Sequence, residues 1–178
     1  LHDILERIDF ETFRGRNYDE WAEQPQIESL IYSTLSNWGF DADEWREGAQ
    51  ELIWNALETP VDLPPTEDRL RLAELERKAR EVDFYLPIPE GYVSPEEDGL
   101  REARAESGFV EGSIDLAFEH DGRIYIADWK SNALEDDYRP SELRTLVARE
   151  YPMQVTLYTM ATMELMDLDD RETFERRF

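Results

Sequence analysis

Apolar residues recur every three to four positions through residues 1–58, and this spacing predicts a mainly helical region. The last of these helices is expected to stop before Pro60, because proline cannot continue a helix. The apolar stripes that carry the prediction are Ile4, Leu5 and Ile8; Ile27, Leu30, Ile31 and Leu35; and Trp45, Leu52, Ile53 and Leu57.

The pattern changes in the middle of the chain. Residues 59–66 contain three prolines and are expected to form a linker. A helix is predicted to resume near Glu67, and the alternating residues 82–86 then favour a strand. Residues 90–107 are acidic, contain Gly and Pro, and are expected to form a surface loop.

Two β-rich runs, residues 109–119 and 123–131, flank the triplet His120-Asp121-Gly122. An Asp-Gly pair between such runs predicts a tight hairpin, because both residues tolerate a positive φ. With Asp121 and Gly122 as the loop, the pairing places Asp115 opposite Asp128 on one face of the sheet. The period of two along a strand places Lys130 on that same face.

Residues 140–166 have a helical pattern that is interrupted at Pro152. Gln154 and Tyr158 are four positions apart, so they are expected to share one face of the helix after the break. The polar tail from Asp167 is expected to fray. Together these elements predict a single α/β domain with a central mixed β-sheet, which contains the hairpin and is flanked by helices.

Composition and charge limit the classes of protein to which this chain can belong. The chain has 178 residues, enough for one domain, and 40% of them are hydrophobic, so a core can form. It has no cysteine, which excludes thiolate metal sites, and no apolar run long enough for a membrane span, so no membrane partner is expected. The formal net charge of −24 argues against nucleic acid as a partner. Only two residues are lysines, Lys78 and Lys130, and this balance resembles that of proteins from a high-salt cytoplasm.

The facing carboxylates Asp115 and Asp128 need compensation, because two like charges across a hairpin destabilise it. One carboxyl could be protonated, a cation of the protein could sit between them, or a divalent metal could bind. Mg²⁺ suits carboxylate oxygens, and a metal-bound water beside Lys130 is a plausible nucleophile for a phosphodiester. The alternative is that both acids are solvated residues at a sheet end.

The run Gly112-Ser113-Ile114-Asp115-Leu116, followed by Ala127-Asp128-Trp129-Lys130-Ser131-Asn132, resembles the signature of the PD-(D/E)xK nucleases. More narrowly it resembles the nuclease domain of RecB-like subunits of bacterial helicase–nucleases (the exodeoxyribonuclease V beta subunit), with AddA-like subunits close behind. Three further blocks match in order: Leu1-His2-Asp3-Ile4-Leu5, residues 81–87 and Gln154-Val155-Thr156-Leu157-Tyr158.

The resemblance implies a restriction-endonuclease-like core over residues 1–178, with 14–66 and 88–107 as variable insertions. It implies that His2, Asp115, Asp128 and the carbonyl of Trp129 bind Mg²⁺, for which Mn²⁺ can substitute. The implied catalytic set consists of the two acids Asp115 and Asp128 together with Glu81, Lys130, Gln154 and Tyr158.

Plainer interpretations stand beside these roles. His2 on its own would be an ordinary surface histidine, and Glu81 the last charged residue of a solvated helix. Asp83 is a second acid near Glu81, and spacing does not decide between them. Gln154 and Tyr158 could form an ordinary helix face, and the Trp129 side chain is expected to pack.

The implied function is Mg²⁺-dependent exonuclease action on DNA, in double-strand break repair and recombination. The implied partners are single strands fed by a helicase in the same chain, RecC- and RecD-like subunits and a recombinase. The location would be cytoplasmic. Because the first residue is Leu, the chain is expected to be a fragment of a larger protein. Two rivals remain: a stand-alone exonuclease or endonuclease of the same fold, and an inactive docking module.

Overall fold

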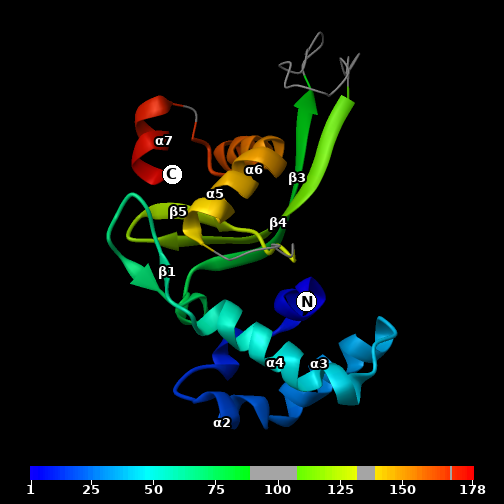
Figure 1. The fold of residues 1–178 in the computed structure, drawn as a ribbon. Coiled ribbons are helices and arrows are strands. Elements are labelled where there is room, and N and C mark those ends of the chain that lie inside the picture. Colours follow the sequence, from blue (N-terminus) through cyan, green and yellow to red (C-terminus); the bar gives the residue numbers. More distant parts are fainter. Residues whose placement is uncertain (89–107, 132–138, 169) are drawn as a thin grey trace. The chain divides into compact units, whose positions relative to one another are not determined.

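The computed structural model describes residues 1–88, 108–131, 139–168 and 170–178, and the chain divides into two units. The first unit comprises Leu1–Lys78 and the second Ala79–Phe178, and each is described by itself (Figure 1). The prediction of a single domain with two variable insertions stays a prediction.

The first unit is helical through residue 58, as the apolar spacing predicted. Side chains start two of its helices: Asn17 and Glu20 form a reciprocal capping box, and Asp41 accepts from the first turn of the longest helix. That helix ends one residue before Thr59, as Pro60 requires. The elements are α1 (His2–Arg7), a 3₁₀ turn (Phe10–Thr12), α2 (Tyr18–Ala22), α3 (Pro25–Asn37) and α4 (Ala42–Glu58).

Only some of the apolar residues that were predicted to be buried form the core of this unit. Trp45 and Leu52 were expected to be buried, but their residues are 52% and 59% exposed. The buried aromatic layer forms elsewhere, where the Phe13 and Trp21 rings lie 4.9 Å apart and Trp54 packs on both. The stripe residues that are buried are Ile4, Leu5, Ile8, Ile27, Ile31, Ile53 and Leu57.

The helix predicted to resume near Glu67 is wrong. Residues there form the short antiparallel pair β1 (Val61–Asp62) and β2 (Arg69–Leu70), followed by a 3₁₀ turn at Leu72–Glu74. Leu70 and Leu72 are two positions apart, which suits an extended chain better than a helix face. Burial of Leu72 and Leu75 therefore holds the segment without a helical repeat.

The second unit has a three-stranded sheet in the order β3–β4–β5. Strand β3 covers Lys78–Ile88, which includes and extends the predicted run 82–86, β4 covers Gly108–His120, and β5 covers Arg123–Ala127. All three strands run antiparallel to their neighbours in the described residues (Figure 1), so the mixed sheet that was expected is not found in this part of the chain. The segment 90–107, predicted as a loop, lies outside the described residues.

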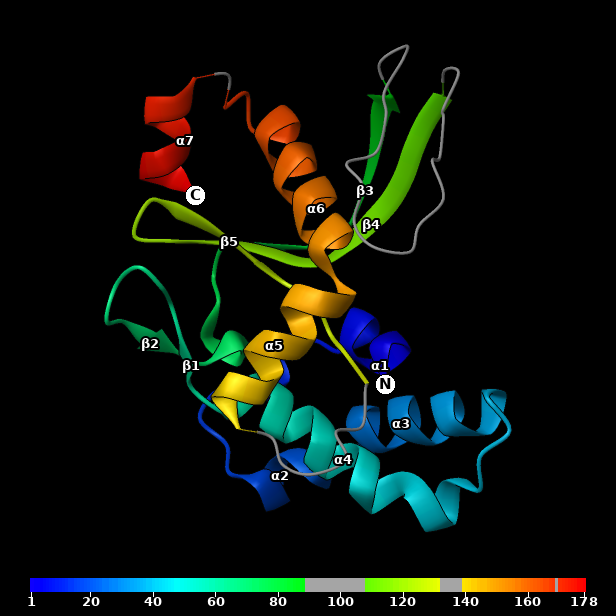
Figure 2. The ribbon, with the colours of Figure 1, turned by 45° about the horizontal axis from the view of Figure 1, so that its top comes forward.

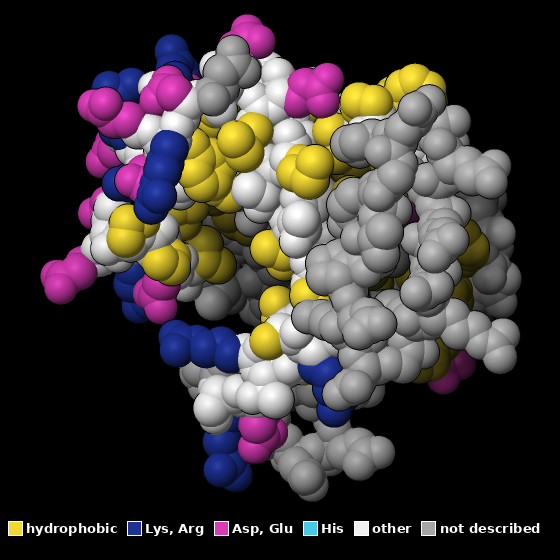
Figure 3. Space-filling model, turned by 90° about the horizontal axis from the view of Figure 1, so that it is seen from above, with side chains coloured by type: hydrophobic (Ala, Val, Ile, Leu, Met, Phe, Trp, Pro, Cys, Tyr) yellow, Lys and Arg dark blue, Asp and Glu magenta, His cyan; other side chains and the backbone are white. Residues whose placement is uncertain are grey.

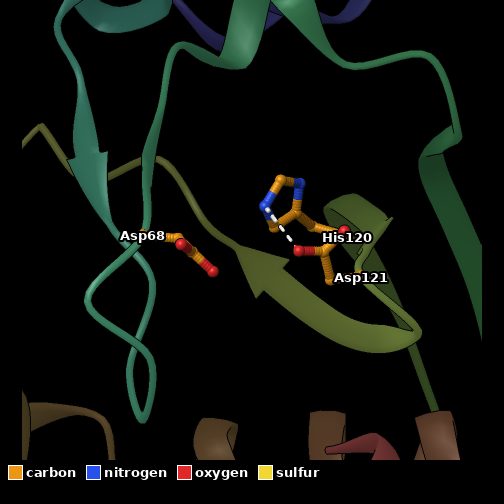
Figure 4. Close-up of side chains that lie close together, drawn as sticks. All are labelled: Asp68, His120 and Asp121. Atoms are coloured by element: carbon orange, nitrogen blue, oxygen red, sulfur yellow. Dashed lines mark ion pairs between the residues drawn. The ribbon is translucent and has the colours of Figure 1, made fainter.

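The hairpin has the predicted loop and register. Asp121 and Gly122 take positive φ values of 47° and 81°, which is the conformation that a tight Asp-Gly turn requires. The pairs run from His120↔Arg123 to Leu116↔Ala127. At the turn, His120 Nε2 lies 3.9 Å from Asp121 Oδ2, as the dashed line in Figure 4 marks; Asp68, also labelled there, belongs to the first unit.

Three helices follow: α5 (Pro140–Glu150), α6 (Pro152–Leu165) and α7 (Arg171–Arg177). The predicted break at Pro152 is confirmed, and α6 continues from α5 with a bend (Figure 2). The prediction of a fraying tail is wrong, because Asp170 caps α7 and Arg177 lies 3.8 Å from Glu119 of the sheet. A core of Phe84, Leu86, Ile114 and Ala161 joins the sheet to α6.

In the described residues, no helix is both long enough and apolar enough to cross a membrane.

Candidate active site

The site forms where β5 ends. The last pair of the ladder is Leu116↔Ala127, so Asp128 is the first residue beyond the strand. The ladder pair predicted between Asp115 and Asp128 therefore does not form. The two acids are joined instead through the next peptide: the backbone N–H of Trp129 donates to Oδ2 of Asp115 at 2.8 Å.

Two side chains of helix α6, Gln154 and Tyr158, contact the carboxylate of Asp128. Gln154 Nε2 donates to Oδ1 of Asp128 at 2.9 Å and to the Tyr158 hydroxyl at 2.7 Å. That hydroxyl lies 2.9 Å from the same Asp128 oxygen and 2.8 Å from the carbonyl oxygen of Ser113 in β4. A phenol has one proton, so it donates to one of these acceptors at a time. The predicted common face of Gln154 and Tyr158 is thus directed at Asp128.

Tyr158 is neutral in this environment. Burial raises the pKa of its hydroxyl to about 12, and the nearby carboxylate of Asp128 acts in the same direction, whereas the hydrogen bond from Gln154 opposes it. Its ring packs edge-on against Phe84, with centroids 5.9 Å apart. At neutral pH Tyr158 therefore keeps its proton and can serve as a hydrogen-bond donor.

Lys130 is placed between a carboxylate and an aromatic ring. Its ammonium forms an ion pair with Oδ2 of Asp128, whose side chain is 17% exposed. The same ammonium lies 4.7 Å from the centroid of the Tyr151 ring, in the range of a cation–π contact. Tyr151 occupies the bend between α5 and α6 that Pro152 imposes. Sequence reasoning assigned Tyr151 no role, although its position just before the predicted break was a usable signal.

Glu81 lies on the neighbouring strand β3 and is exposed. The Ser113 hydroxyl donates to its Oε2 at 3.4 Å, a long hydrogen bond, and the Ser113 carbonyl oxygen lies 2.8 Å from the Tyr158 hydroxyl. Glu81 has a φ of 47°, an uncommon conformation for a residue other than glycine. Asp83 is likewise exposed, and both acids alternate with the buried Phe84 and Leu86.

The other two predicted ligands are His2 and the carbonyl of Trp129. His2 is the first residue of α1 and belongs to the first unit, whereas both acids belong to the second. For Trp129, the described contact involves its amide rather than its carbonyl.

The donor set at Asp115 and Asp128 suits a hard divalent cation. Asp115 accepts its hydrogen bond through Oδ2, and Asp128 accepts through Oδ1. Within the described residues no hydrogen bond reaches Oδ1 of Asp115. Oxygen of a carboxylate is the ligand that Mg²⁺ prefers. Two acids and one lysine leave a formal charge of −1, which favours a bound cation.

No family model matches this chain. Curated relatives are found among the RecB subunits of RecBCD enzymes: that of Escherichia coli is 28% identical over 90% of this chain, and that of Haemophilus influenzae is 31% identical over 84% of it. A further relative, from the ATP-dependent helicase/nuclease of Bacillus pumilus, is 30% identical over 48% of the chain.

The chain spans only a small part of these relatives, 14% of the E. coli protein and 13% of the H. influenzae protein. Its motif resemblance and its relatives nevertheless agree. The chain is homologous to a segment of the RecB-like subunits of bacterial helicase–nucleases, as the ordered sequence motifs predicted.

Proposed function

We propose that this chain is a metal-dependent nuclease module, which hydrolyses phosphodiester bonds of single DNA strands. The observation that carries the proposal is the joint placement of Asp115, Asp128 and Lys130. The backbone amide of Trp129, the residue after Asp128, donates a hydrogen bond to Asp115, and Lys130 forms an ion pair with Asp128. Paired acids beside one lysine suit metal-assisted attack on a phosphate, whereas a solvated sheet end would not need the partly buried hydrogen-bond network around Asp128.

Asp115 and Asp128 would hold Mg²⁺, or Mn²⁺ in its place, with the Trp129 carbonyl as a further ligand. The role of His2 as a ligand stays a prediction from the resemblance. The bound metal would supply a water activated for attack and positive charge next to the phosphate. Gln154 and Tyr158 orient Asp128 by donating to its Oδ1 and leave its Oδ2 for Lys130. Such support from residues around the ligands keeps a carboxylate in one orientation.

Lys130 would stabilise the charge that develops on the phosphate oxygens. Its ammonium already meets a carboxylate and an aromatic face, so its long side chain is directed before substrate arrives. Glu81 would support the metal or a second cation from β3, through the Ser113 hydroxyl that donates to it. Gln154 and Tyr158 would also position the scissile strand.

The biological setting is proposed from the relatives. Their names describe parts of the RecBCD enzyme and of an ATP-dependent helicase/nuclease. We infer exonuclease action in double-strand break repair and recombination, on strands delivered by a helicase part of the same protein. RecC- and RecD-like subunits and a recombinase would be its partners.

The test is digestion of linear single-stranded DNA in Mg²⁺ by the wild-type chain, Asp128→Asn and Lys130→Ala. We expect both variants to lose at least about a hundredfold in rate, since each removes a group that acts on the phosphate or its metal. Equal rates in all three proteins would contradict the proposal.

Metal binding is tested separately, so that a chain without its helicase still gives an answer. Mg²⁺ should raise the melting temperature of the wild type, because a ligand that binds the native state stabilises it by RT ln(1 + [L]/Kd). Asp115→Asn should lose this response. Glu111→Gln is the matched control, because it also removes one carboxylate from β4 and Glu111 is exposed.

A further inference from the structure

A cavity of about 350 Å³ adjoins the candidate active site within the second unit. Its walls come from Ile124 and Ile126 of β5, Val147 of α5 and Val155 of α6, together with the rings of Tyr151 and Phe178. In Figure 3 hydrophobic side chains gather around a hollow in the surface, with Lys or Arg side chains along its lower edge. The cavity is therefore mainly apolar and aromatic.

The polar lining of the cavity belongs to the site itself. Asp128, Lys130 and Gln154 all line it, so the groups proposed to act on the phosphate border the apolar space directly. Tyr151 joins the two parts, because its ring forms cavity wall and also meets the ammonium of Lys130 at 4.7 Å. A ligand that fills this space would have an anionic group at Lys130 and a flat apolar group attached to it.

A nucleotide has that form. Its phosphate is anionic, and its base is a planar ring system that stacks on aromatic side chains whatever its identity. The volume lies at the lower end of the range of about 300–1,000 Å³ that small-molecule pockets cover, which suits one nucleotide and not a base pair.

We propose that this cavity is a subsite for one nucleobase, next to the phosphate that Asp128 and Lys130 would act on. The proposal rests on the nuclease function proposed above and adds how the strand is held. A base in the cavity would fix the position of its phosphate, and a duplex would have to open before a base could enter. The site would thus favour single strands or frayed ends by shape, without reading sequence.

The test uses two single-stranded oligonucleotides of equal length, one with thymine at every position and one with an abasic residue at every second position. In Mg²⁺ the wild-type chain should cut the second one unevenly, with a product ladder that repeats every two nucleotides. Cleavage at every phosphate at one rate would overturn the subsite while leaving the nuclease function intact.

A filling variant tests the cavity itself. Val155 is 54% exposed, so Val155→Trp can enter the cavity without disturbing the core. It should raise KM for the thymine oligonucleotide about fivefold or more, the scale of a lost stacking contact, with kcat changed less than about twofold. The matched control is Met153→Trp on the same helix, because Met153 is 58% exposed and is not among the cavity residues. Equal KM in the two variants would overturn the proposal.

Binding is measured in parallel by fluorescence anisotropy with Ca²⁺ in place of Mg²⁺. The wild type should bind the thymine oligonucleotide about fivefold more tightly than the alternately abasic one. Equal dissociation constants for the two oligonucleotides would overturn the subsite whether or not cleavage occurs.

Discussion

The hydroxyl of Tyr158 lies 2.9 Å from Oδ1 of Asp128, a residue that is 30 positions away in the sequence. This contact joins helix α6 to the end of β5, and it depends on the hydroxyl alone, because the ring packs separately on Phe84. Removal of the hydroxyl therefore tests the orientation of Asp128 without removing the ring.

We expect Tyr158→Phe to lower the nuclease rate by about tenfold or more, since a misplaced acid costs that much in well-ordered sites. The free energy of unfolding should fall by about 1.5 to 3 kcal/mol, the usual range for a lost hydrogen bond to a charged group. Urea denaturation and DNA digestion measure the two effects. The control is Tyr85→Phe, where Tyr85 is 66% exposed; an equal response of both variants would contradict the role of the hydroxyl.

Gly112 is required by the close approach of Phe84. A Cβ atom at Gly112 would lie 2.5 Å from Cζ of the Phe84 ring, which is 5% exposed and cannot move into solvent without cost. We expect Gly112→Ala to lower the free energy of unfolding by about 1 to 3 kcal/mol, the usual cost of overpacking a core. Because Phe84 supports the Tyr158 ring, the nuclease rate should fall as well.

Gly108→Ala provides the matched control for this prediction. Gly108 starts the same strand, and a Cβ atom there would meet nothing within 4 Å. Its unfolding free energy should stay within about 0.5 kcal/mol of the wild type, as for most surface substitutions. If Gly112→Ala is as stable as Gly108→Ala, the packing of Phe84 does not restrict this position.

Tyr151 is expected to act on Lys130 through its ring. The ammonium lies 4.7 Å from the ring centroid, and a cation–π contact needs the aromatic face, not the hydroxyl. Tyr151→Phe should therefore keep the nuclease rate within about twofold, whereas Tyr151→Leu should lower kcat by about fivefold, the equivalent of roughly 1 kcal/mol. Single-turnover digestion distinguishes them, and an equal loss in both variants would assign the effect to the hydroxyl instead.

The net charge of −24 predicts a response to salt. Self-repulsion destabilises a compact chain of one sign, and the screening length shortens from about 10 Å at 0.1 M to about 3 Å at 1 M. We expect the melting temperature to rise as KCl increases over this range. A melting temperature that falls steadily up to molar KCl would contradict both this prediction and the comparison with proteins of high-salt cytoplasm.

The same charge disagrees with the proposed partner. It argued against nucleic acid, whereas the function proposed from the RecBCD and helicase/nuclease relatives acts on DNA. Net charge reports on solubility and long-range steering, whereas a metal site depends on a few local groups. In a chain with two lysines, the ion pair of Lys130 with Asp128 is therefore a better guide to the candidate site than the net charge of −24.

Features governed by near neighbours were predictable from the sequence. The Asp121-Gly122 turn and its register follow from the backbone freedom of two residues, and the break before Pro152 follows from its missing N–H. The common face of Gln154 and Tyr158 follows from helix geometry. The predictions of a helix near Glu67 and of a fraying tail were wrong, because both segments depend on long-range contacts. Leu72 and Leu75 are buried in the first segment, and Arg177 of the tail pairs with Glu119.

The sequence by itself determined the turn, the helix break and the motif residues, because each depends on backbone preferences within a few positions. Only the tertiary structure decided that β5 ends before Asp128, so that the Trp129 amide, not a strand pair, ties it to Asp115. It also decided that Tyr151 meets Lys130, because that contact requires a helix bend to pack beside the end of a distant strand. Such contacts depend on how whole elements pack, which local spacing does not specify.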